Sequence, residues 1–120
     1  AFGVPRRLAR PPARAGGGGA VKFRKRPVVV EAFQMTPAAR SSNENWPEWL
    51  HEAWNADPDS TGALFIDELD PKRLRLLIRT LEGVVRVDWG AWIILGVAGE
   101  LYPCKPDIFA ATYEPEEVEP

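Results

Sequence analysis

Residues 73–81, RLRLLIRTL, decide the fold of this chain, because their pattern distinguishes a strand from a helix. Leucine or isoleucine stands at positions 74, 76 and 78, and arginine stands at positions 73, 75 and 79. Alternation with a period of two predicts a strand that is buried on one face. Glu82 and Gly83 then predict a turn, and the valine-rich residues 84–87 predict the second strand of a hairpin.

Further short elements are predicted on both sides of this hairpin. The β-branched run within residues 22–35 predicts a strand that is covered on both faces near its middle. Residues 64–66, 91–97 and 100–102 predict shorter strands, and residues 112–114 are a candidate last strand. Residues 36–45 are rich in turn formers and predict a loop, and Pro103 is expected to end the strand that precedes it.

Two helices complete the prediction. Pro47 suits the first helical position, and an apolar stripe recurs at steps of three and four residues. The stripe consists of Trp46, Trp49, Leu50, Ala53 and Trp54. Pro106 suits the start of a second, short helix. These elements predict an α+β fold with a mainly antiparallel sheet of about five strands in hairpins, either open or half closed into a barrel, and a Trp-rich helix on one face.

The composition changes along the chain and suggests where the folded unit lies. Residues 1–20 have four consecutive glycines, three prolines and no hydrophobic period, so we expect a disordered leader. A targeting peptide and a mistranslated ribosome-binding site upstream of a start at Val21 are the alternatives for this leader. Residues 21–115 are predicted to form a single α+β domain, and the acidic residues 116–120 are expected to fray.

The charge and the apolar content restrict the classes of partner. Residues 21–120 carry 11 bases against 17 acids, so a nucleic-acid partner is disfavoured. The basic residues 22–26 are the one counter-signal. No apolar run approaches the roughly 20 residues of a membrane span. The single cysteine, Cys104, cannot form an internal disulfide, so we expect a cytoplasmic protein.

Two blocks of sequence resemble a widespread family of small, uncharacterised phage and prophage proteins. The first is KFRKRPVVVEAFQ, residues 22–34, and the second is GVAGELYPCKPDIFAATYEP, residues 96–115. Ala91 departs from the resemblance, because it stands where the family pattern has an aspartate. The resemblance implies a bacterial host and a shared fold, and it implies no established activity.

Six residues are candidates for a binding site. Lys105 and the amides that follow Pro106 could hold an anion, and Cys104 is the only thiol, placed just before a helix N-terminus. Tyr102 is a candidate for holding a ligand. The alternative is that Tyr102 is an ordinary strand residue whose hydroxyl has a hydrogen-bond partner within the protein. The full set is Arg24, Lys25, Tyr102, Cys104, Lys105 and Asp107.

No catalytic residue, metal ligand or cofactor is predicted. His51 is distant in sequence from Cys104, and the cysteine and histidine inventory is too small for a metal site that is not built from carboxylates. A hydrolase would need two carboxylates to converge, for example from Glu82, Asp88 and Glu100. We therefore expect a non-enzymatic phage accessory protein that binds a host or phage protein or a small anionic ligand. A virion structural or assembly protein and a protein that sequesters nucleotide-like defence signals are the alternatives.

Overall fold

The predicted hairpin lies at the centre of the structure, a computed structural model that describes residues 19–116. Strand β3 (Leu76–Thr80) pairs antiparallel with β4 (Gly83–Val87), and the register places Thr80 opposite Gly83. Gly83 has a φ of 124°, a conformation that glycine adopts without steric cost. β2 (Leu64–Ile66) pairs with the other edge of β3, which gives the sheet order β2-β3-β4. The hairpin and the strand at residues 64–66 are confirmed.

β3, the first strand of the hairpin, begins three residues later than the alternation predicts. Arg73 has a left-handed φ of 53°, and Leu74 is 47% exposed instead of facing the core. The cause is Asp70, whose carboxylate accepts hydrogen bonds from the backbone N–H groups of Leu74 and Arg75 at 2.9 and 2.8 Å. A side chain that captures these N–H groups competes with the sheet ladder. The prediction of a strand from residue 73 is therefore wrong for residues 73–75.

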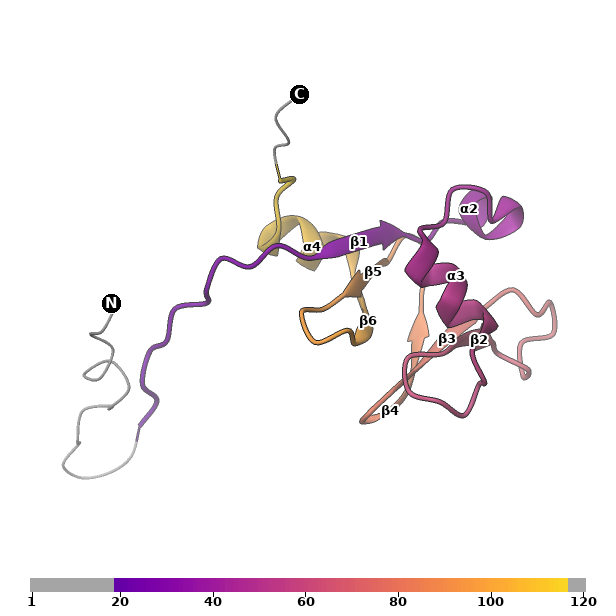
Figure 1. Ribbon diagram of the computed structural model, residues 1–120, viewed down its shortest axis with the longest axis horizontal. Helices are drawn as coiled ribbons and strands as arrows, with labels where there is room; N and C mark the ends of the chain where they lie inside the picture. The colour runs from indigo at the N-terminus through magenta and orange to yellow at the C-terminus, as the bar shows by residue number, and fades with distance from the viewer. Residues whose placement is uncertain (1–18, 117–120) are drawn as a thin grey trace.

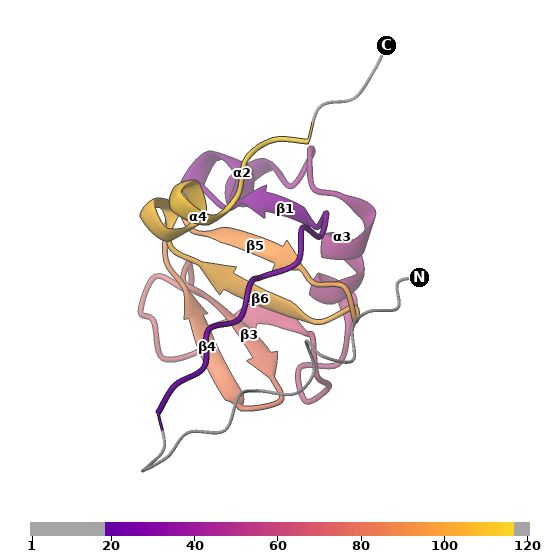
Figure 2. The same cartoon turned by 90° about the vertical axis from the view of Figure 1, so that its left-hand side faces the viewer.

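A second antiparallel sheet contains the remaining strands. It is formed by β1 (Glu31–Gln34), β5 (Trp92–Leu95) and β6 (Leu101–Cys104), in the order β1-β5-β6. The α+β class with antiparallel strands is confirmed, but the strands are divided between two sheets of three (Figure 2). The division arises because β5 pairs with β1 instead of continuing the hairpin from β4. The Met35 N–H donates to the Ala91 carbonyl at 2.9 Å and extends this pairing beyond the strands.

The two sheets and one helix share a single apolar core. Helix α3 (Glu48–Asn55) begins after Pro47, which is the N-cap and not the first helical residue, and it packs on β2. The predicted apolar stripe of this helix is confirmed, with Leu50 and Ala53 buried. The buried cluster draws residues from α3 and from both sheets: Met35, Trp46, Leu50, Ala53, Leu64, Leu76, Ile78, Val87, Ala91, Ile93 and Leu101.

The predicted strand over residues 22–35 is confirmed only at its C-terminal end. Its partner β5 ends at Leu95, opposite Glu31, and the chain then turns through residues 96–99. Residues 21–30 consequently have no neighbouring strand to pair with among the described residues. They run away from the body as an extended segment, drawn in indigo in Figure 1. We call residues 21–30 the arm.

The predicted loop over residues 36–45 contains a helix that sequence reasoning missed. α2 (Pro37–Ser42) has Thr36 as its N-cap, whose Oγ1 accepts from the Ala39 N–H at 3.1 Å, and Pro37 at its start. A threonine followed by proline is a helix-start signal, and it was present in the sequence. The indole Nε1 of Trp46 donates to the Ala39 carbonyl at 2.9 Å and so ties α2 to the start of α3.

The C-terminal region corrects two further predictions. Pro103 lies inside β6 and does not end it, which is tolerated because β6 is an edge strand with β5 on one side only. Helix α4 (Pro106–Thr112) starts as predicted at Pro106. The candidate strand at residues 112–114 is wrong, because Thr112 closes α4 and no strand follows it among the described residues. The predictions for residues 1–18 and 117–120 lie outside the part of the chain that the structure describes.

Candidate functional site

The outer face of the β1-β5-β6 sheet carries the candidate site. The register places Ala32, Ile94 and Tyr102 in one row across the three strands, and Gln34, Trp92 and Cys104 in a second row. Side chains of directly opposite residues share a face of the sheet. The other face, with Ile93 and Leu101, belongs to the main core. The outer face is therefore available to α4 and the arm.

Three aromatic rings connect this face to α4. The Trp92 and Phe109 rings stack with centroids 4.3 Å apart and planes at 7°, and Phe109 stacks on Tyr113 at 5.0 Å. Stacked aromatic pairs contribute beyond their buried area, by roughly 0.5–1.5 kcal/mol each. We call Trp92, Phe109 and Tyr113 the aromatic ladder. It holds the short helix α4 against the sheet, because the described part of α4 has no buried residue of its own.

A groove of about 780 Å³ runs between the arm and α4. Its walls are mostly apolar, which is typical of protein sites that bind other molecules. The arm contributes Pro27, Val28, Val29 and Val30, and the sheet contributes Ala32 and Trp92. The helix side contributes Phe109 and Tyr113, and the chain that follows α4 contributes the carboxylates Glu114 and Glu116.

Two of the residues that the sequence singled out meet at the end of the aromatic ladder. The Lys25 Nζ lies 5.2 Å from the centroid of the Tyr113 ring, within the range of a cation–π contact. The Tyr102 hydroxyl lies 3.5 Å from the Tyr113 hydroxyl, at the limit of a hydrogen bond. Burial, together with the Tyr113 hydroxyl, raises the pKa of Tyr102 to about 12, so this phenol is neutral at physiological pH. Tyr113 is the residue of this site that sequence reasoning missed.

The other predicted site residues do not converge on one point. Arg24 is exposed on the arm, Cys104 stands opposite Trp92 as a half-buried free thiol, and Lys105 is the N-cap residue of α4. Asp107 occupies the first turn of α4 and places its negative charge at the helix N-terminus. Tyr113 thus brings Lys25 and Tyr102 to the end of the aromatic ladder, while Lys105 and Asp107 lie at the far end of α4 from Tyr113.

The groups considered for catalysis are held by other partners. His51 packs against the Trp46 ring at 5.6 Å on α3, and no hydrogen bond joins it to Cys104 within residues 19–116. Asp88 pairs with Arg86 at 3.0 Å. Glu100 accepts from the Ala98 N–H at 3.0 Å and closes the turn before β6. These carboxylates therefore support turns, and they do not form a pair with one another.

The resembling C-terminal block corresponds to this face of the molecule. Gly96 and Gly99 form the turn before β6: a Cβ on Gly96 would overlap the Glu100 carboxylate, and Gly99 has a φ of 86°. Residues 101–104 are β6, and residues 106–113 are α4 and the end of the aromatic ladder. The block thus encodes the outer-face structure from the turn to Tyr113.

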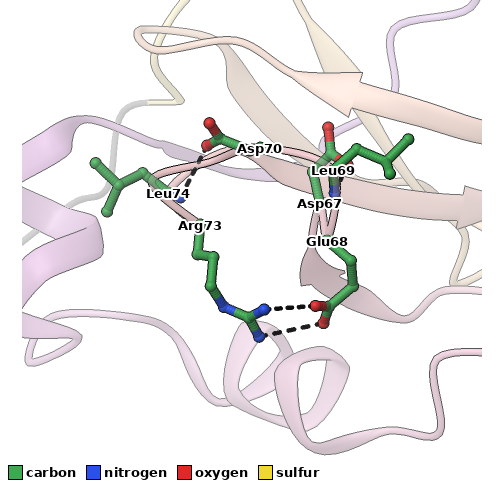
Figure 3. Close-up of polar contacts among 6 residues, drawn as sticks. All are labelled: Asp67, Glu68, Leu69, Asp70, Arg73 and Leu74. Carbon is green, nitrogen blue, oxygen red and sulfur yellow. Dashed lines mark hydrogen bonds and ion pairs between the residues drawn. The ribbon is translucent and has the colours of Figure 1, made fainter.

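A second hollow, of about 650 Å³, lies on the other side of the molecule beside β2. Its lining includes Asp67, Glu68 and Leu69, which begin the loop of residues 67–75 that Figure 3 shows in close-up. In this loop Asp70 accepts from the Leu74 N–H at 2.9 Å, and the Arg73 guanidinium donates to the Glu68 carboxylate at 2.6 and 3.3 Å. The backbone hydrogen bonds from Arg75 and Leu74 keep the pKa of the Asp70 carboxyl below its usual value.

Two aromatic rings that line this second hollow, Trp54 and Phe65, already form cation–π contacts with arginines of the same chain. The Arg40 guanidinium lies 4.8 Å from the Trp54 ring centroid, and that of Arg79 lies 5.6 Å from the Phe65 ring centroid. Because these two rings already contact arginines and Arg73 already pairs with Glu68, the groove beside α4 is the stronger candidate for binding a partner.

Comparisons with protein-family models, with curated proteins and with solved structures find no match to this chain. Among the described residues, no helix has both the length and the apolar character needed to cross a membrane. The same residues contain no cluster of three His, Cys, Asp or Glu side chains able to hold a metal ion.

Proposed function

We propose that this chain is a non-enzymatic interaction module that binds a protein partner through the arm and the groove beside α4. The observation that carries the proposal is the coincidence of exposed apolar side chains with the groove. Val28 and Val29 are 49% and 67% exposed, and both line it. Exposed apolar surface next to a concave apolar site is the usual signature of a protein contact.

The resemblance to phage and prophage proteins supports an accessory role in a bacterial host cell, with the cytoplasm as the compartment. A structural or assembly protein of the virion is the second candidate. The exposed arm favours it, because an extended segment that leaves the body is suited to contacts between subunits.

Sequestration of nucleotide-like signals is the weaker candidate. Trp92 and Phe109 stack face to face at 4.3 Å, so a base cannot enter between these two rings. Of the basic candidate residues, Lys25 lies on Tyr113, and Lys105 lies at the other end of α4. Thermal-shift screening with cyclic and ADP-ribose-like nucleotides tests this candidate; a rise in Tm would revive it.

Site-specific photo-crosslinking tests the interaction module directly. A photoreactive phenylalanine analogue at Val29 places the reactive group in the groove at an exposed position. We expect illumination of expressing cells to give a discrete covalent adduct whose second component is a protein identified by mass spectrometry. The matched control carries the same analogue at Lys72, an exposed position in the loop on the other side of the molecule.

The comparison between the two positions decides the outcome. A Val29 adduct in clear excess over the Lys72 adduct supports a protein contact at this face. Equal or absent crosslinking at Val29 would overturn the proposal that the groove is a protein-binding surface.

A further inference from the structure

The arm combines two properties that are unusual for the end of a folded domain. It has the β-branched composition of a strand, yet residues 21–30 make no backbone hydrogen bond to another described residue. Phe23 is 80% exposed and Val29 is 67% exposed. When a partner covers the exposed apolar side chains of a strand-like segment, the free energy of the system falls.

The charge of the arm is opposite to that of the body. Residues 22–26 carry four bases and no acid, whereas residues 27–116 carry 7 bases against 15 acids. At the groove itself the charged lining residues are Glu114 and Glu116, both acidic. Opposite charges across an interface favour association and set its register.

The basic residues of the arm lie next to the acidic groove, because residues 27–30 of the arm form one wall of the groove and Lys25 contacts Tyr113. A surface that contains both a donor segment and its acceptor is self-complementary. Two copies related by a two-fold axis can then exchange the ends of their arms, so that the residues before Lys25 of each copy enter the groove of the other.

We propose that this protein forms a symmetric dimer by reciprocal arm exchange. Phe23 of each copy occupies the apolar groove beside α4 of the other, and Lys22, Arg24 and Arg26 face the carboxylates Glu114 and Glu116. Lys25 remains on Tyr113 of its own chain and fixes the direction in which the arm leaves the body. The inference rests on the proposed function, since it names the protein that occupies the groove.

Light scattering after size-exclusion chromatography measures the assembly directly. The full chain is expected to have twice the 13.4 kDa mass of one copy, and Phe23→Ser with Val29→Ser is expected to reduce that mass twofold. Leu69→Ser with Leu81→Ser is the matched control, because both leucines are about 90% exposed and lie outside the arm and the groove. The control is expected to stay dimeric.

A charge exchange tests the pairing without removing apolar surface. Variant one carries Lys22→Glu, Arg24→Glu and Arg26→Glu, so residues 22–26 then hold three acids against one base and its arm and groove are both acidic. Variant two carries Glu114→Lys and Glu116→Lys, so both are basic. Each variant alone is expected to be monomeric, and an equimolar mixture is expected to recover the dimer mass. Circular dichroism spectra that match the parent exclude unfolding as the cause of dissociation.

The outcomes separate this inference from the proposed function. A full chain that stays at 13.4 kDa at the highest concentration measured overturns arm exchange, as does a mixture that remains monomeric. If the Val29 crosslink then identifies a different protein, the groove is still a binding surface and only its occupant is wrong. If the mass doubles but both charge variants remain dimeric, another surface makes the dimer and arm exchange is refuted.

Discussion

The two faces of the β1-β5-β6 sheet differ in how completely they are covered. The inner face contributes Ile93 and Leu101 to a core that is closed by α3 and the β2-β3-β4 sheet. The outer face is covered by α4, a helix of seven residues that is held through the aromatic ladder. Stability thus resides on the inner side, while the outer side keeps an open groove, which is the arrangement expected where a surface must remain available for binding.

The largest expected effect separates two neighbouring residues of β5. Ile93 and Ile94 are both fully buried, but Ile93 belongs to the main core and Ile94 lies on the face that α4 covers. Truncation of a buried isoleucine costs about 2–5 kcal/mol, depending on how well the site collapses. We expect Ile93→Ala near the upper end of that range and Ile94→Ala near the lower end, because α4 can settle into the space.

Urea unfolding of the two variants measures both free energies of unfolding. If Ile94→Ala is as destabilising as Ile93→Ala, the outer side is as tightly packed as the core, and the contrast between the two faces is wrong.

The second prediction concerns the aromatic ladder. Phe109→Ala removes the middle ring and both stacked contacts of the ladder, including the contact with Trp92 that joins α4 to the sheet. Since Phe109 is only half-buried, we expect a cost of about 2 kcal/mol, below the 3–5 kcal/mol typical of a fully buried phenylalanine. Hydrogen exchange should accelerate in α4 and remain slow in β3. Uniform acceleration across both elements would show that α4 is part of the same cooperative unit as the core.

The fold was predictable where one segment carries its own pattern. The hairpin of β3 and β4, the stripe of α3 and the start of α4 at Pro106 all follow from local periodicity and proline chemistry. The division into two sheets was not predictable, because it depends on β5 choosing β1 instead of β4 as its partner. The predicted length of the first strand was wrong for a similar reason. The arm has strand composition, but among the described residues no strand lies beside it, because β5 ends at Leu95.

The candidate site was predictable only in part. Lys25 and Tyr102 were singled out from the sequence, and the structure brings both to Tyr113. Tyr113 lies in the range predicted as a strand, although its four-residue spacing from Phe109 suits the end of α4, where the structure places it. The contact of Trp92 with Phe109 joins distant parts of the chain, so no local pattern reports it.

The third prediction compares two tryptophans that each donate one hydrogen bond. Trp46 is buried and donates to the Ala39 carbonyl at 2.9 Å, whereas Trp49 donates to the exposed Glu31 carboxylate at 3.0 Å. Trp46→Phe removes one of the two hydrogen bonds that the part-buried Ala39 carbonyl accepts, the other coming from the Asn43 N–H at 3.0 Å, and should cost about 1 kcal/mol. Trp49→Phe should cost less than about 0.5 kcal/mol, because water replaces the lost donor. Chemical unfolding of both variants checks the difference, and equal costs would contradict it.

The smallest expected effect is a change of the free energy of unfolding with pH, which arises from Tyr102 on the outer face. Burial raises the pKa of Tyr102 to about 12 from its ordinary value of 10.0. The unfolded chain therefore loses this proton first as the pH rises, so the stabilising contribution is complete below pH 10 and declines between about pH 10 and 12. Tyrosine absorbance should show one residue titrating near the upper value, and Tyr113→Phe should lower the pKa of Tyr102 by removing the hydroxyl at 3.5 Å. A Tyr102 that titrates at an ordinary value in the parent chain would mean that solvent reaches the ladder freely, and the outer face would then be open along its whole length rather than only at the groove.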